Sequence, residues 1–324
     1  MDQIQHSVFK VDTEPHCVWE WDLRERNLEF INAINSRYFE YLAGVHLEKL
    51  KNEPEEKQLA AVALRTAYHH GMETLFTFLC ATIQAPDCIF GWILMSRPSQ
   101  IRQLVKKIGS GRDNIFNKQN LEYVSWNAIS ARIHASSNKD KDRVAETAKC
   151  FADLWARFST DYIEERNVHE YNSIKHGLRT SLGGFGLSTG SETEYGKAAP
   201  PENMHSVGHS EYGTSFFIAE QIQGSHESKK KDLHFRARRC SLNWNPANIA
   251  NGLILQSMSI NNILSYLKII HGVDPSTCMF IRPQDAEDFK KPWSHSVSPL
   301  YCSMDKVISE HDIKRFSKED LCKI

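Results

Sequence analysis

The segment from residue 140 to residue 177 constrains the fold most, because its apolar residues keep the period of an α-helix over many turns. They recur in steps of three and four, which places them on one face of a helix. The residues of this stripe are Val144, Ala148, Phe151, Trp155, Phe158 and Tyr162. Acidic residues lie near the start and basic residues near the end, as the helix dipole favours. The sequence therefore predicts one long core helix over 140–177.

Two further segments predict long helices. The segment 58–84 is apolar nearly all round in its second half and has no proline before Pro86, which indicates a central buried helix. The segment 246–272 follows Asn245, a favourable N-cap, and runs to a stop at Gly272. Shorter helices are expected at 31–44, 98–111 and 120–135.

The predicted fold class is mainly α (α+β): a helical bundle core with a small antiparallel β-hairpin inserted between late helices. The hairpin is expected from two strand-like segments, 213–223 and 232–244, which flank a polar loop. Residues 18–30 are expected to be extended. The glycines GGFG at 183–186 follow a helix rather than a strand, so they predict a turn and not a phosphate-binding loop. The expected segments, in one compact body, are 1–57, a core at 58–180, the turn, hairpin and helix at 181–272, and a polar tail with short helices at 273–324.

Charge and cysteine content limit the functional class. The 324 residues include 39 Lys and Arg against 40 Asp and Glu, so any attraction to nucleic acid or to an anionic membrane must be local. The eight cysteines form no CxxC pair, which favours reduced thiols in a cytoplasmic protein over a disulfide framework. The N-terminus lacks the pattern of a signal peptide, and no apolar stretch reaches the roughly 18 residues of a membrane span. We therefore expect a cytoplasmic protein with no membrane partner, cofactor or bound metal.

The end of the 140–177 segment becomes polar without changing its face. Further steps of three and four along the stripe reach Arg166, His169, Asn172 and His176. Polar side chains at the edge of a core are where clefts and perturbed pKa values arise. This end of the helix is therefore a candidate site.

An ordinary helix stop explains part of the same stretch. Gly177 and Leu178 match the two positions that follow a helix in a Schellman motif, and Lys175 and His176 suit the negative end of the helix dipole. The residues that this interpretation leaves unexplained are Arg166, His169, Tyr171 and Asn172.

The run Y-N-S-I-K-H-G at 171–177 resembles the R-N-x-x-x-H motif of HEPN domains, which also lies late on a long helix of a helical bundle. The resemblance covers residues 58–180. It implies either a metal-independent ribonuclease of the kind found in toxin and phage-defence systems or a nucleic-acid-associated scaffold. Asn172 and His176 occupy motif positions, whereas Tyr171 stands where the family has arginine. A tyrosine cannot supply the fixed charge of a guanidinium, so a nearby cation must replace it: Arg166, Lys175 or Arg179.

The resemblance leads to two alternative functions. In the first, an RNA-directed enzyme uses His176 as general base or acid and Asn172 to orient it, while Arg166 or Arg179 clamps the phosphate with Lys175 as a further contact. In the second, a non-catalytic module of the same shape binds a partner or a ligand. Tyr171 and the near-neutral charge favour the second. The resemblance also implies homodimers with the motif at the interface, and no motif specific for DNA is found.

Histidines elsewhere in the chain are weaker candidates. His69 and Glu73, with His70 between them, lie in the segment 58–84 and are four residues apart on one helix face. They could form an acid–base pair with the histidine-containing helix end, hold a metal together with it, or form a hydrogen-bonded structural acid with histidines at its rim. The lack of regular ligand spacing disfavours the metal. His205 and His209 are spaced like a helical metal pair, but the glycine-containing run around them predicts a loop.

The second strand of the expected hairpin carries a basic face. His234, Arg236 and Arg238 alternate onto one side of it, where they are candidate contacts for RNA phosphates. The alternative is a solvated face in which these cations form ordinary cross-strand pairs with Glu220 or Glu211.

Overall fold

The computed structural model describes residues 6–19, 23–51, 54–111, 114–222, 234–294, 303–307, 313–314, 319 and 322. For residues 221–222, 234, 303–307 and 313–314 it describes the backbone alone. The chain divides into two compact units. The first comprises Met1–Lys51, Ala63–Asn167 and Ala247–Ser294, and the second comprises Asn52–Val62, Val168–Pro246 and His295–Ile324. Their borders differ from the segments expected from the sequence, and three helices each run past a border.

Helices dominate the first unit, as the predicted fold class requires. The helices that lie wholly or mostly within it are α1 (Leu23–Ala33), α2 (Tyr38–Lys49), α3 (Pro54–Gln84), α4 (Ile89–Met95), α5 (Pro98–Ser110), α6 (Trp126–His134), α7 (Lys141–Ile163) and α9 (Pro246–Ile270). A two-stranded antiparallel sheet, β1 (His6–Val11) with β2 (Glu14–Trp19), precedes them. The expected helices at 58–84, 98–111 and 246–272 are confirmed as α3, α5 and α9.

The apolar stripe of α7 forms part of the core, as its period predicts. Phe151, Trp155 and Phe158 are fully buried. Trp155 donates its indole hydrogen to Ser259 Oγ of α9 at 3.0 Å, so even the polar atom of this large side chain is satisfied. The helix begins at the cap residue Asp140, whose carboxylate accepts hydrogen bonds from the first backbone N–H groups.

The prediction of a single helix over 140–177 is wrong. α7 ends at Ile163, Glu164 is extended with ψ 120°, and a separate helix α8 (Glu165–Lys175) follows. The side-chain amide of Asn167 donates to the backbone oxygen of Asp161 at 2.9 Å, which satisfies one of the last carbonyls of α7. An extended residue changes the direction of the chain, so the stripe of α7 does not continue in phase into α8. The side chains that α8 buries are instead Glu170, Ser173 and Ile174.

The second unit contains a small antiparallel sheet. Its strand order is β3 (Thr180–Leu182), β6 (Gly213–Ile222), β7 (His234–Asn243) and β8 (Ser303–Val307), and β9 (Ile313–Lys314) also pairs with β7. The predicted hairpin is confirmed as β6 and β7, with Phe216 opposite Cys240. The polar tail was expected to hold only short helices, but its described residues also supply β8 and β9, because β7 offers them an open edge.

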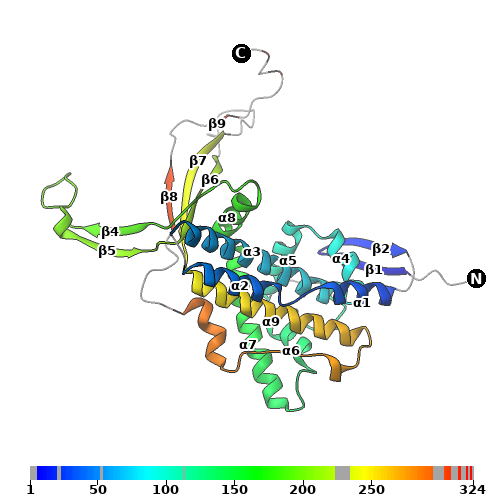
Figure 1. Cartoon of the computed structure of the whole chain (residues 1–324). Coiled ribbons are helices and arrows are strands. Elements are labelled where there is room, and N and C mark those ends of the chain that lie inside the picture. The colour runs from blue at the N-terminus through cyan, green and yellow to red at the C-terminus, as the bar shows by residue number, and fades with distance from the viewer. Residues whose placement is uncertain are drawn as a thin grey trace, which may run out of the picture. The chain divides into compact units, whose positions relative to one another are not determined.

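A second pair of strands leaves this sheet as a separate ribbon. β4 (Gly186–Gly190) and β5 (Met204–His209) pair with each other and extend away from β6 and β7 (Figure 1). The first three residues of the GGFG run form the turn between β3 and β4, as predicted, and Gly186 begins β4. A Cβ atom on Gly184 would lie 2.1 Å from the backbone oxygen of Ser210, so this turn requires glycine.

Several local expectations are wrong. Residues 23–33 are helical rather than extended, and α2 continues to Lys49 instead of ending at Gly44. His205 and His209 lie on the strand β5 rather than in a loop. Four residues of a strand span about 13 Å, so these two histidines cannot share a metal ion.

Candidate functional site

The end of α8 is a helix stop of unusual geometry. Gly177 has the left-handed φ of 102° that the sequence predicts, but the next residue, Leu178, is also left-handed with φ 48°. The side chain of Leu178 is 57% exposed rather than packed back on the helix. The backbone N–H of Arg179 donates to Ser173 O at 2.8 Å, which satisfies one of the last carbonyls. The chain thus turns sharply directly after His176.

Two side chains at this helix end are open to an external ligand. His176 and Arg179 are exposed. Neither side chain forms a hydrogen bond or an ion pair with any residue in the described part of the chain. The backbone N–H of His176 donates to Asn172 O at 3.0 Å, an ordinary helical bond. The predicted role of Asn172 in orienting the His176 side chain stays a prediction.

Tyr171 occupies the position of the motif arginine and has a different partner. The ammonium group of Lys175 lies 5.2 Å from the centroid of the Tyr171 ring, in the geometry of a cation–π contact. Tyr171 therefore brings a cation to this helix end although it carries no charge itself. Arg166 is exposed, and His169 is half-buried.

The residue of α8 that packs most deeply is one that the sequence analysis did not select. Glu170 is fully buried, and its Oε1 accepts hydrogen bonds from the Thr214 hydroxyl and, at 3.1 Å, from Trp244 Nε1. A buried carboxylate is tolerated only with such donors. These contacts join α8 to the sheet of its own unit. A prediction of a new helix beginning at residue 165 would have placed Glu170 and Ile174 on one face. The local sequence, however, contains no signal that a helix begins there.

His69, His70 and Glu73 lie on α3 in the first unit. His69 is buried, with its ring centroid 6.1 Å from that of Tyr68. His70 is exposed and meets the Phe39 ring edge-on at 5.4 Å. Because Asn172 and His176 belong to the second unit, the pairing of these two groups of residues stays a prediction. In the described ranges, no group of three or more His, Cys, Asp or Glu side chains is arranged to hold a metal ion.

A buried polar cluster lies where α7 ends. Arg65 of α3 is buried and donates to Asn167 Oδ1 at 2.9 Å, with its guanidinium carbon 5.7 Å from the centroid of the Tyr68 ring. Tyr68 donates its hydroxyl hydrogen to Asp161 Oδ2 at 2.8 Å. Burial raises the pKa of Asp161, although the Tyr68 hydrogen bond and the charge of Arg65 oppose this shift. Sequence reasoning missed this cluster because its members are isolated polar residues within apolar helices.

The basic face of β7 is partly neutralised within the sheet, because one carboxylate meets two arginines. Glu220 of β6 lies opposite Arg236 and pairs with it at 2.6 Å and with Arg238 at 2.8 Å. The Arg236 hydrogen bond holds the pKa of Glu220 below its usual value. The alternation of these arginines onto one face and their pairing with Glu220 are both confirmed, which weakens the case for a phosphate-binding face.

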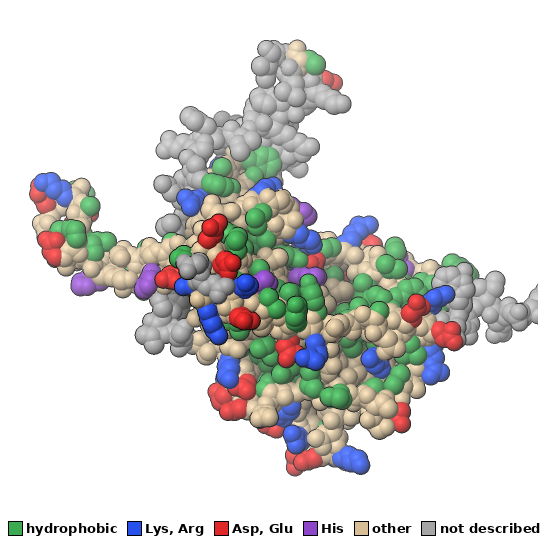
Figure 2. Space-filling model, viewed as in Figure 1, with side chains coloured by type: hydrophobic (Ala, Val, Ile, Leu, Met, Phe, Trp, Pro, Cys, Tyr) green, Lys and Arg blue, Asp and Glu red, His purple; other side chains and the backbone are tan. Residues whose placement is uncertain are grey.

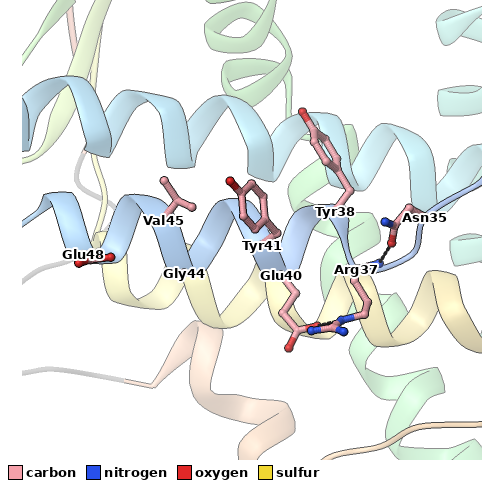
Figure 3. A pocket seen from close by; sticks show the side chains of 8 residues that line it. All are labelled: Asn35, Arg37, Tyr38, Glu40, Tyr41, Gly44, Val45 and Glu48. Carbon is pink, nitrogen blue, oxygen red and sulfur yellow. Dashed lines mark hydrogen bonds and ion pairs between the residues drawn. The ribbon is translucent and has the colours of Figure 1, made fainter.

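A broad open groove of about 610 Å³ follows α2. Figure 3 shows its lining side chains, with Tyr38, Tyr41 and Val45 on one side of the helix and the ion pair of Arg37 and Glu40 on the other. One helix and the turn before it supply all of these residues. The groove is therefore shallow and has no cluster of reactive groups.

The β4–β5 ribbon exposes almost every side chain that it carries. Acidic residues predominate at and near its tip, with Glu192, Glu194 and Glu202 against Lys197 alone. Figure 2 shows charged and hydrophobic groups together at this tip. The large apolar side chains that the ribbon exposes are Leu187, Tyr195, Met204 and Val207.

Comparison with known proteins identifies no relative. No protein-family model, curated protein or solved structure matches the chain. Within the described residues, no helix combines the length and the apolar character that crossing a membrane requires.

Proposed function

We propose that the protein is a non-catalytic binding module that self-associates through the β4–β5 ribbon. The observation that carries this proposal is the exposure of all five residues of β4 and of nearly all of β5. An isolated two-stranded ribbon is at best marginally stable in water. A partner that covers the ribbon would stabilise it.

The two edges of the ribbon differ in how well they are protected against pairing with another strand. The register shifts so that Leu187 and Ser188 of β4 face Gly208 and Ser206 of β5, which leaves Val207 as an extra residue on β5. Such a bulge twists an edge and disfavours the addition of another strand. β4 has no extra residue, no proline and no charged side chain, so it lacks the features that protect an open edge.

A second copy of this chain is the partner that fits β4. Antiparallel pairing of β4 with β4 of another molecule gives a two-fold interface in which backbone groups satisfy one another. The acidic residues that follow Gly190 then lie at opposite ends of the shared sheet, so they do not repel each other. The same acidic residues make nucleic acid an unfavourable partner for the ribbon.

Sedimentation velocity over a concentration series tests this proposal. The native protein is expected to form dimers that dissociate on dilution, because such a small interface binds weakly. Thr189→Pro removes a backbone donor and stiffens the strand, and it is expected to shift the protein to monomers. The control variant is Thr193→Pro, which lies beyond the end of β4 and leaves its edge intact, so this variant should still form dimers. Ser206→Pro is less suitable as a control because it disturbs β5 and therefore the ribbon itself. Monomers up to about 100 µM would reject self-association.

A second candidate function is RNA cleavage at the end of α8. The observation that favours it is the exposure of His176 and Arg179 without a partner among the described side chains. Together with Lys175 they supply a titratable group and cations for a phosphate, as the HEPN resemblance implies. Cleavage of single-stranded RNA without metal should fall to background in His176→Ala and persist in His70→Ala, which removes an exposed histidine elsewhere. RNA cleavage at the background rate in the native protein and in both variants would reject this function.

A further inference from the structure

A small cavity of about 80 Å³ lies in the first unit, between the start of α7 and the segment that follows α9. Phe280 and Ile281 contribute its apolar wall. Six polar residues complete the lining: Ser137, Asn138, Arg143, Thr147, Asn262 and Arg282. None of the eight lining residues is acidic, so every formal charge on the wall is positive.

Arg282 is held in place by α7. Its NH1 group donates to Glu146 at 3.0 Å and to the Thr147 hydroxyl at 2.8 Å, and its side chain is only 17% exposed. The Arg282 hydrogen bond and charge lower the pKa of Glu146, so this pair stays ionised. The guanidinium therefore needs no reordering to meet a ligand, which reduces the entropic cost of binding.

Arg143 supplies a second cation, whose charge also contributes to lowering the pKa of Glu146. Its side chain is exposed and forms no hydrogen bond or ion pair with the residues that the structure describes. Two guanidinium groups on one small cavity leave a positive charge that Glu146 offsets only in part. A ligand with two negative charges satisfies this arrangement better than a ligand with one.

The base of the cavity is rigid. Asn262 is fully buried and exchanges two hydrogen bonds of 2.8 Å with the backbone of Ile281. Its amide nitrogen also lies 3.2 Å from His134 Nε2. This network fixes the position of the segment that carries Arg282, so both sides of the cavity keep their separation.

We propose that this cavity binds a tetrahedral oxyanion of the phosphate class, either free or as the terminal group of a phosphate monoester. The guanidinium groups of Arg143 and Arg282 meet its charge, and the Ser137 hydroxyl and the Asn138 amide can donate to its oxygen atoms. Because a water molecule occupies about 30 Å³ of liquid, the cavity holds two to three waters or one such ion.

Calorimetric titration of the full chain tests the proposal. Inorganic phosphate, glycerol phosphate and acetate are compared at equal ionic strength, with the native protein, Arg143→Gln and a matched control, Lys149→Gln. Both substitutions remove one exposed cation from α7, but only Arg143 lines the cavity. We expect saturable phosphate binding that weakens about tenfold or more in Arg143→Gln and is unchanged in Lys149→Gln.

The other outcomes are also decisive. Binding of glycerol phosphate alongside inorganic phosphate would show that the mouth of the cavity admits a carbon chain, and binding of inorganic phosphate alone would restrict the site to the free ion. Acetate bound as tightly as phosphate would overturn the assignment to this class. No saturable heat from either phosphate, or equal losses in the two variants, would overturn the site itself.

Discussion

Thr214 of β6 donates its hydroxyl hydrogen to the fully buried carboxylate of Glu170 on α8, and the two residues are separated by 43 others along the chain. Trp244, directly after β7, donates to the same oxygen atom at 3.1 Å. One acidic side chain thus joins the helix that ends just before His176 to the sheet from which the ribbon leaves.

Glu170→Ala is expected to lower the free energy of unfolding by about 2–4 kcal/mol, because it leaves two buried donors unsatisfied and opens a cavity. Urea unfolding measures this change. Glu165→Ala, on the exposed first turn of α8, serves as the control and should change stability by less than about 0.5 kcal/mol. A similar loss of stability in both variants would mean that the change in helix propensity, and not the loss of the buried hydrogen bonds, causes the destabilisation.

The stability contributed by His134 should depend on pH. This histidine is fully buried, stacks on Phe151 with ring centroids 4.6 Å apart, and burial lowers its pKa to about 4. The unfolded chain therefore takes up a proton on this residue at a higher pH than the folded chain. Stability attributable to neutral His134 is complete above pH 6.5 and declines as the pH falls towards 4, by up to about 3 kcal/mol.

Urea midpoints of the native protein and His134→Gln, measured between pH 7.5 and pH 4.5, isolate this contribution. The difference in stability between them should shrink as the pH falls. A difference for His134→Gln that does not vary with pH would contradict the prediction.

Asp161 should show the opposite pH dependence. Burial raises its pKa, so the folded protein takes up a proton here more readily than the unfolded chain does. Relative to Asp161→Asn, the native protein should gain stability as the pH falls from neutrality through the raised pKa towards 3.8. Unfolding midpoints of the two proteins on the same pH series measure this gain, and a relative loss at low pH would refute it.

The left-handed backbone at Leu178 should be strained. Asparagine tolerates this conformation better than a branched residue, and the exposed leucine side chain makes little packing contribution. Leu178→Asn is therefore expected to raise the free energy of unfolding by up to about 1 kcal/mol. Gly177→Ala, at the preceding left-handed position, should lower it by about 1 kcal/mol. Thermal unfolding of both variants tests whether the first substitution stabilises the protein and the second destabilises it. Destabilisation by Leu178→Asn would show that the Leu178 side chain packs against the protein in solution.

A disulfide can report the proposed pairing of β4 with its own copy. If the two-fold axis passes the central residue of this strand, the Cβ atoms of the two copies of Ser188 lie about 5 Å apart. Ser188→Cys should then form a covalent dimer under mild oxidation, as seen on a non-reducing gel. Ser206→Cys on β5 controls for the native cysteines and for chance collisions. Equal dimer formation by both variants would argue against pairing through β4.

Much of the helical architecture could be predicted because its signal is local. The stripe Phe151, Trp155 and Phe158 repeats at the helical period, and the second half of α3 is apolar nearly all round. The hairpin of β6 and β7 and its pairing of Arg236 with Glu220 also follow from alternation over a few residues. The candidate site could be predicted only in part: the helix stop at Gly177 was visible, but the second left-handed residue, Leu178, was not.

The sequence by itself determined which segments are helical and which face of each long helix is apolar, because those properties depend on neighbours three or four residues apart. The tertiary structure decided where α7 ends and what α8 buries. Glu164 carries no helix-breaking signal, and the break is stabilised by Arg65 and Asn167, which are 102 residues apart. The burial of Glu170 likewise depends on two distant donors, Thr214 of β6 and Trp244 after β7, and no local pattern encodes such partners.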